Sequence, residues 1–186
     1  AMICVLAPIA MAAVVIGGML GANVATMTTY SLLCNMVIAL VAPVVIALTG
    51  SGHCSFVEIL SRVAPLLIMP FAAAQCCRFL FHRASRWIAD HSQISFYMWL
   101  LSLVVIIGRT AFIIDLRDVS PGIELWLVFA ALVICLVQFK IGRMLGRRYG
   151  DAVAGGQSLG QKNTVLAVWM AQSFLNPISS IAPTAY

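Results

Sequence analysis

Long apolar stretches separated by short polar ones dominate the chain. Stretches of about 18 or more apolar residues with few charges are typical of transmembrane helices. These stretches are continuously apolar, whereas the strands of a membrane barrel alternate apolar and polar positions. The pattern therefore predicts an all-α, multi-pass membrane protein with one membrane domain over residues 1–186. The predicted segments are 1–20 (interrupted by Pro8 and by Gly17-Gly18), 22–48, 56–81, 94–114, 123–141 and 163–175, and a further element begins at Asn176-Pro177.

The polar stretches between these segments alternate in charge. The stretches after the third and fifth segments, 82–93 and 140–148, are basic, whereas the turns at 49–54 and 115–121 contain a single arginine between them. Cytoplasmic loops are enriched in Lys and Arg, so the two basic stretches are expected to be cytoplasmic. Residues 82–92 form either a short helix on the inner membrane surface, with Trp87 and Ile88 in the lipid, or an ordinary loop.

Composition agrees with a protein embedded in the lipid bilayer. The chain is 62% hydrophobic and 9% charged, whereas soluble domains have about 25% charged residues. Topology accounts for the net charge of +5, so no nucleic-acid partner is expected. The six cysteines are expected to be small buried packing residues, and no metal site is expected from them or from His53, His82 and His91. No catalytic triad, zinc motif or carboxylate pair is present, so we expect no enzyme.

The passage from Ala154 to Thr164 is unusual for a membrane protein. It contains three glycines and six polar residues, including Lys162. A span needs about 20 apolar residues, and too few follow Lys162 before Asn176-Pro177. Part of the passage is therefore expected inside the membrane, where irregular backbone is tolerated only if it is buried or lines a cavity. An ionisable residue there is a candidate functional residue; the alternative is a cytoplasmic loop with Lys162 snorkelling to the surface.

Other polar residues in the apolar segments have simpler explanations. Arg62 and Glu58 are expected to be interfacial anchors. Arg109, near the outer end of its segment, is expected to snorkel outward or to pair with Asp115 rather than to bind a substrate. Several glycine pairs have the small-xxx-small spacing of close helix packing, and several prolines mark expected kinks. These are Gly17 and Gly21, Gly142 and Gly146, and Pro43, Pro65 and Pro70.

Two segments resemble the bile acid:sodium symporter family. In that family a glycine, two residues and an asparagine precede a helix containing Leu-Ala, and a proline-rich step into the last helix ends at an aromatic residue. Residues 21–45 are similar to the family's fifth helix, with its small residue, asparagine and valine at the start and a proline near the end. The matching residues at 160–186 are Gly160, Asn163, Leu166-Ala167, Pro177, Pro183 and Tyr186.

The resemblance implies a ten-helix fold of two inverted repeats, of which this chain covers helices four to nine and the start of ten. Residues 1–55 and 122–186 are then core-type helices, and 56–114 are panel-type helices. The other helices are expected from the same parent protein or from a second copy. The fourth and ninth helices of the family are broken and cross near the membrane midplane. The breaks are then expected near Ala7-Pro8 and Ser158-Gly160, with Pro8, Gly156 and Gly160 as the breaking residues.

Most positions that bind sodium in the family are substituted in this chain. A glutamate position is occupied by Ser158, a glutamine position by Lys162, and a threonine position by Ser31; a serine-asparagine pair falls on Ala12-Ala13. We therefore hypothesise that Lys162 is a tethered cation in place of sodium. Burial disfavours the charged form of an amine, so proton coupling is one version of this hypothesis. Uniport with a permanently charged lysine is the other.

The resemblance implies a secondary transporter of an organic anion, bile-acid-like or a small carboxylate, in the bacterial inner membrane. The alternative is a non-transporting membrane fragment or assembly partner. Asn163 suits a helix N-cap and is expected to cap or bridge the break. The substrate, the coupling ion and the oligomeric state stay open. The candidate substrate- and ion-binding residues are Lys162, Asn163, Ser158, Gln161, Thr164 and Ser31, and no metal ligand or other cofactor is expected.

Overall fold

The computed structural model describes residues 1–49, 55–91, 93–117 and 119–186. His53, Cys54 and Asp118, and with them most of the predicted turn at 49–54, lie outside the described residues. Every named element is a helix, which confirms the all-α class. The elements are α1 (Met2–Leu6), α2 (Met11–Met19), α3 (Val24–Thr49), α4 (Phe56–Leu80), α5 (His82–Asp90), α6 (Gln93–Arg117), α7 (Pro121–Arg148), α8 (Ala152–Gly160), α9 (Thr164–Phe174), the 3₁₀ helix η1 (Pro177–Ser180) and α10 (Ile181–Ala185).

Four helices are long and apolar enough to cross a membrane: α3, α4, α6 and α7. They confirm the predicted segments 22–48, 56–81, 94–114 and 123–141. The expected end of the last one at 141 is wrong, because α7 continues through the basic stretch to Arg148. Lys and Arg are good helix formers, and basic residues in the last turn interact favourably with the helix dipole. The prolines of α3 and α4 lie inside continuous helices.

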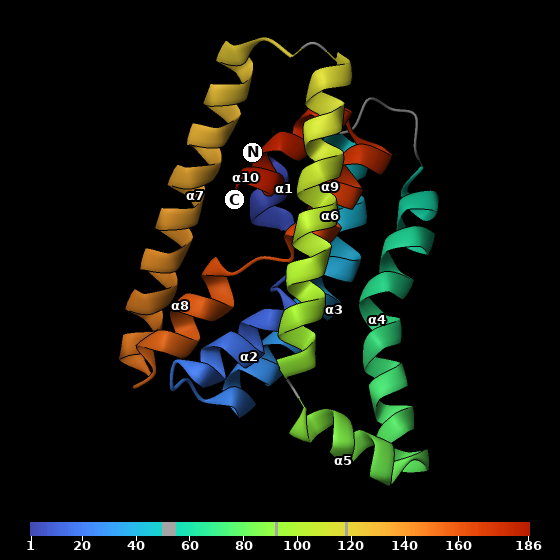
Figure 1. Ribbon diagram of the computed structural model, residues 1–186, viewed down its shortest axis with the longest axis vertical. Helices are drawn as coiled ribbons and strands as arrows, with labels where there is room; N and C mark the ends of the chain where they lie inside the picture. Colours follow the sequence, from blue (N-terminus) through green and yellow to red (C-terminus); the bar gives the residue numbers. More distant parts are fainter. Residues whose placement is uncertain (50–54, 92, 118) are drawn as a thin grey trace.

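The basic segments lie at one end of the molecule. Residues 82–90 form the short helix α5 rather than a loop, and Trp87 and Ile88 are exposed on it. Figure 1 shows α5 at the lower end of the view, where the C-terminal end of α7 also lies. The C-terminal ends of α3 and α6 and the N-terminal ends of α4 and α7, which flank the turns with few basic residues, lie toward the opposite end. This arrangement agrees with the topology expected from the loop charges.

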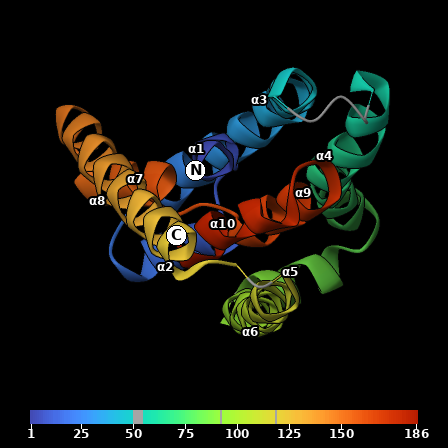
Figure 2. The same ribbon diagram turned by 90° about the horizontal axis from the view of Figure 1, so that it is seen from above.

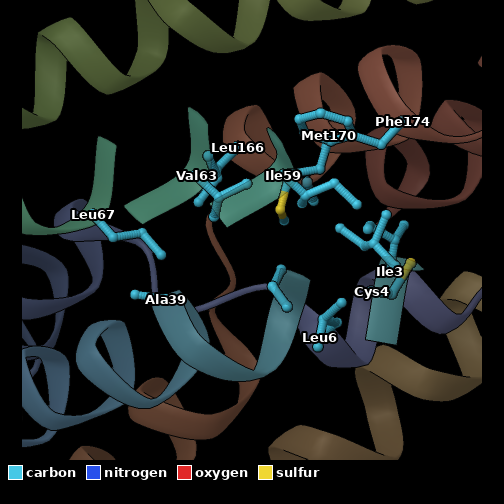
Figure 3. Close-up of a cluster of buried hydrophobic side chains, with 14 of the residues drawn as sticks. Ile3, Cys4, Leu6, Ala39, Ile59, Val63, Leu67, Leu166, Met170 and Phe174 are labelled. Atoms are coloured by element: carbon cyan, nitrogen blue, oxygen red, sulfur yellow. The ribbon is translucent and has the colours of Figure 1, made fainter. Parts of the chain in front are cut away.

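Short helices occupy the centre of the molecule, between the long ones (Figures 1 and 2). Residues from α1, α3, α4 and α9 form the main apolar core. Figure 3 shows Ile3 and Leu6 of α1, Val63 of α4 and Met170 of α9 as members of this core. Each of these side chains is at least nine-tenths buried. The core therefore holds the upper halves of two interrupted helices, α1 and α9, against the long helices α3 and α4.

Glycines allow α8 to lie directly against α7. A Cβ atom at Gly155 would lie 2.7 Å from the Cα of Gly146 and would also overlap the carbonyl oxygen of Gly142. This confirms the close packing expected at Gly142 and Gly146. The predicted pair Gly17 and Gly21 is wrong for Gly21, which has a φ of 85° in a turn with no atom within 4 Å of its Cβ position.

The interruption expected at Gly17-Gly18 is also wrong, because both glycines lie inside α2, which ends at Met19. Gly17 is buried and faces the side chain of Met27, where a Cβ atom would overlap the sulfur. The absence of a side chain therefore serves packing against α3, and that packing offsets the cost of glycine in a helix.

Candidate functional site

Two interrupted helices cross at the centre of the molecule. The first is interrupted between α1 and α2, at residues 7–10, and the second between α8 and α9, at residues 161–163. Ile9 and Lys162 form an isolated antiparallel bridge. The Ala10 N–H donates to the Gln161 carbonyl at 2.9 Å, and the Asn163 N–H donates to the Pro8 carbonyl at 2.7 Å. In Figure 1, α2 and α8 lie below this crossing and α1 and α9 above it.

Two facts explain this arrangement: proline lacks a backbone N–H, and buried backbone N–H and C=O groups require hydrogen-bond partners. Pro8 has no N–H to donate, so α1 ends before it and α2 begins after it. A helix break leaves N–H and C=O groups without intrahelical partners. The two breaks satisfy one another through the hydrogen bonds between residues 8–10 and 161–163. Irregular backbone at membrane depth is tolerated when it is satisfied inside the protein in this way.

The second break lies farther along the chain than expected. Gly156 and Ser158 lie inside α8, and the helix ends at Gly160. The prediction of a break at Gly156 is therefore wrong. A Cβ atom at Gly156 would lie 2.6 Å from Cγ of Arg143, and one at Gly160 would overlap the ring of Phe139. Both glycines therefore pack α8 against α7, and only Gly160 also adjoins a break.

Lys162 is buried at the crossing. Its relative exposure is 7%, so the alternative of an exposed cytoplasmic loop is wrong. Among the described residues, no carboxylate oxygen lies within 4.0 Å of its ammonium group. Lys162 also contributes to the wall of a cavity of about 350 Å³, together with Gln161, Thr164 and residues of α6, α7 and α10.

Asn163 caps α9, as expected. Its Oδ1 accepts a hydrogen bond from the Leu166 N–H at 3.0 Å. It also lines two neighbouring cavities, of about 350 and 390 Å³, which share Met11 and Val165 in their walls. Lys162 contributes to a different cavity. The consecutive residues 162 and 163 therefore line different cavities, two of which share Trp99 of α6.

The other candidate residues are distributed over three places. Gln161 and Thr164 line the same cavity as Lys162, and the Oε1 atom of Gln161 is buried without a hydrogen-bond partner among the described residues. Ser158 lines a separate cavity of about 670 Å³ between α3, α7 and α8. Ser31 is buried in α3, where the side-chain amide of Asn35 donates to its carbonyl oxygen at 2.7 Å. Ser158 and Ser31 therefore do not line the Lys162 cavity.

Tyr186 is part of this site although the sequence analysis gave it no role there. Its hydroxyl lies 2.6 Å from the Gly160 carbonyl oxygen, at the end of α8, and 2.6 Å from Oε1 of Gln138 in α7. Gln138 is a buried polar residue in a long apolar helix. A glutamine at this position of an apolar segment was the one feature of the sequence that could have indicated a functional or structural role for Gln138. The contact stabilises the end of α8, immediately before Lys162.

Asp151 holds the other end of α8. Its Oδ1 accepts from the Ala154 N–H at 2.8 Å, and its Oδ2 accepts from the Asn23 N–H at 2.7 Å. These two hydrogen bonds, the one from Ala154 first, hold the pKa of the Asp151 carboxyl below its usual range. The carboxylate thus connects the start of α8 to the turn before α3.

Arg109 agrees with only part of the expectation. It forms no ion pair with Asp115; the ion pair found among the described residues joins Arg62 to Glu58 at 3.0 Å, which agrees with their expected role as anchors. Arg109 contributes instead to the wall of the 390 Å³ cavity that Asn163 also lines. The expected pairing with Asp115 is therefore wrong, whereas the expectation that Arg109 snorkels outward is not contradicted, because the residue is exposed.

The crossing, its buried lysine and the cavities around it are the features on which a functional interpretation depends. The cysteines give no support for another kind of site: Cys4 is buried, Cys34, Cys77 and Cys135 are half-buried, and Cys76 is exposed, so the expectation of burial fails for Cys76. Comparison with known proteins adds no identification, since no family model, no curated protein and no solved structure matches the chain.

Proposed function

We propose that this protein is a secondary transporter of organic anions, of the bile acid:sodium symporter type, in the inner membrane of a bacterium. The observation that carries this proposal is a buried ammonium group, Lys162, at the crossing of two interrupted helices. Secondary transporters place their substrate and ion sites where discontinuous helices meet. A charged residue in a membrane segment is costly, and it is usually retained for a function.

The charge at the crossing favours an anion over a cation as the bound species. Lys162 has no carboxylate partner within 4.0 Å among the described residues. Sodium needs several oxygen ligands, and an ammonium group repels it. Lys162 therefore takes the place of a bound metal ion, and an incoming anion supplies the missing negative charge. The N-terminus of α9 adds a partial positive charge on the same side of the break.

In this proposal the chain contributes helices four to nine and the start of ten to an inverted-repeat fold. The elements α1–α3 and α7–α10 belong to the core domain, and α4 and α6 to the panel domain. The crossing of the two breaks is the feature of the fold that supports this assignment. The remaining helices come from the parent protein or from a second copy.

Uptake by proteoliposomes tests the proposal. The purified protein is reconstituted, and uptake of labelled organic acids, one bile acid and one small carboxylate, is measured with sodium and with potassium as the only cation. We expect uptake that does not need sodium and that Lys162→Met abolishes. Lys140→Met is the matched control, because Lys140 is the other lysine of the chain and is exposed on α7; it should transport normally.

A pH profile separates the two versions of the mechanism. Proton coupling requires Lys162 to lose its charge during the cycle, so uptake falls when alkaline pH leaves the amine neutral throughout. A permanently charged lysine gives a flat profile between about pH 6 and 8. Strict dependence on sodium would contradict the replacement of sodium by Lys162. A folded protein without uptake of any acid would support the non-transporting alternative.

A further inference from the structure

A second cationic residue, Arg109, lies beside the crossing, in the wall of a cavity that Asn163 also lines. The cavity there has a volume of about 390 Å³ and lies between α3, α4, α6 and α9. Its polar wall consists of Arg109, Asn35, Asn163 and Gln172, and its apolar wall includes Leu66, Leu67, Ile106 and Trp169. Lys162 is not part of this wall. A ligand of this cavity would therefore interact with Arg109, the charged group in its wall, and not with Lys162.

The position of Arg109 in α6 is deep for an interfacial anchor. It precedes the last residue of the helix, Arg117, by eight residues, which is about 12 Å along a helix. The next residue, Thr110, is buried and its hydroxyl lies 2.9 Å from the hydroxyl of Thr184 in α10. This hydrogen bond fixes the rotation of α6 beside the crossing. Within the described residues, no carboxylate oxygen lies within 4.0 Å of the Arg109 guanidinium.

One amide side chain of the cavity, that of Gln172, lacks hydrogen-bond partners among the described residues. Both Nε2 and Oε1 of Gln172 are buried and make no hydrogen bond to the described residues. Asn35 uses its amide nitrogen on Ser31, at 2.7 Å from the carbonyl oxygen, and Asn163 uses its Oδ1 on the cap of α9. A buried amide left unpaired costs free energy, so a polar ligand or water in the cavity would stabilise this arrangement.

From these observations we propose that the cavity binds the carboxylate or sulfate group of an organic anion through Arg109, with the hydrocarbon body of the anion against α4 and α9. A guanidinium binds such groups through two parallel hydrogen bonds. Gln172 supplies an amide donor, and Trp169 and the leucines supply an apolar surface. The proposal rests on the proposed transport function and adds to it a second anion site that is separate from Lys162. It favours acids with a bulky apolar body over small, fully polar ones.

Calorimetry with two matched probes tests this site. The protein is placed in lipid nanodiscs, and 4-tert-butylbenzoate is titrated in, with 4-tert-butylbenzamide as the neutral probe of the same shape; empty nanodiscs correct for partition into lipid. We expect the acid to bind and the amide to bind at least about tenfold more weakly, because hydrogen bonds to charged groups are the stronger ones.

Variants of α6 assign the binding to Arg109. Arg109→Gln should weaken binding of the acid about 10- to 100-fold, and Arg109→Lys should weaken it less. Arg117→Gln removes the same charge from the exposed end of the same helix and should change nothing. In a protein with Trp169 as its one tryptophan, the acid should change the fluorescence of Trp169. That response keeps the test valid if the heat signal is small.

The outcomes separate this inference from the transport proposal. Equal binding by Arg109→Gln and the unchanged protein, or equal binding of acid and amide, would overturn the second site while leaving transport through Lys162 untouched. Binding that needs Arg109, in a protein that transports nothing, would support the site and contradict the transport function. Binding lost in Lys162→Met but retained in Arg109→Gln would move the anion to the Lys162 cavity and overturn the inference.

Discussion

Three basic side chains in the membrane-spanning region have different surroundings. Arg62 is exposed and forms an ion pair with Glu58 at 3.0 Å, as an interfacial anchor can do at little cost. Lys162 is buried, Arg109 lines a cavity, and neither has a carboxylate within 4.0 Å among the described residues. Lys162 and Arg109 both lie beside the crossing. An anion that enters from outside the protein would neutralise them, which is the physical basis of both proposals.

The carboxylate of Asp151 gives a prediction at the scale of one residue. Its pKa is lowered in the folded protein, first by the hydrogen bond from the Ala154 N–H and then by that from the Asn23 N–H. In the unfolded chain an aspartate has a pKa of about 3.9. The charged group therefore stabilises the fold above about pH 4, and this stabilisation is lost as the pH falls through the lowered folded-state pKa.

Asp151→Asn should remove this acid-dependent part of the stability. The thermal midpoint of the detergent-solubilised protein, measured from pH 6 to pH 3, should fall less on acidification in the variant than in the unchanged protein. Asp151→Ala also removes the helix cap and should cost about 0.5–2 kcal/mol at pH 6. Asp90→Asn, at the exposed end of α5, serves as the control. Identical acid responses of Asp151→Asn and the unchanged protein would contradict the prediction.

At the scale of elements, the contact between α7 and α8 depends on glycine. The backbones approach so closely at Gly155 that a Cβ atom would lie 2.7 Å from the Cα of Gly146, which cannot move without moving α7. Gly155→Ala should therefore destabilise the protein by about 1–3 kcal/mol, the usual cost of overpacking. The thermal midpoint in detergent measures it.

Gly108 in α6 is the matched control for this substitution. No atom lies within 4 Å of its Cβ position. Because alanine has the higher helix propensity, by about 1 kcal/mol, Gly108→Ala should keep or raise the thermal midpoint. Equal midpoints for Gly155→Ala and the unchanged protein would show that α8 does not pack on α7 as described.

The helix boundaries and breaks could be predicted from the sequence only in part. The long helices were predictable, since their hydropathy alone marks 24–49 and 56–80 within two residues of the predicted segments. The end of α7 was not, because a helix can continue into a basic stretch outside the apolar region. The exact break after α8 was also missed. Gly156 looks like a helix breaker in the sequence, and only the position of Arg143 on the neighbouring helix shows that it is a packing residue.

The candidate site was also predictable only in part, because some of its residues come together only through tertiary packing. Lys162 and Asn163 could be predicted because they belong to a polar passage, and the apolar segment after it is too short to span a membrane by itself. One of the two expectations for Arg109, the pairing with Asp115, is wrong, and Gln172, in the apolar helix α9, was not singled out. Their shared cavity is formed by four helices that are distant in sequence. A contact of this kind depends on tertiary packing, on which the local pattern of a single sequence has no bearing.

At the scale of the whole molecule, the distribution of basic residues gives an orientation. Figure 1 shows α5 and the C-terminal end of α7 at the same end of the molecule, and these segments carry most of the basic residues. The start of α7, at Ser120, lies at the opposite end. Because positively charged loops stay in the cytoplasm, α5 and Tyr149 should face the cytoplasm and Ser120 the outside of the cell.

Labelling of single cysteines in intact bacteria checks this orientation. The six native cysteines are replaced by serine or alanine, and one cysteine is introduced at Ala89, Tyr149 or Ser120, all of which are exposed. A maleimide that cannot cross the inner membrane should label Ser120→Cys in intact cells and the other two only after the membrane is opened. The reverse pattern would mean that the chain is inserted the other way round. Labelling of all three in intact cells would show that α7 does not span the membrane, and the transport proposal would then lose the bilayer depth that it assigns to Lys162.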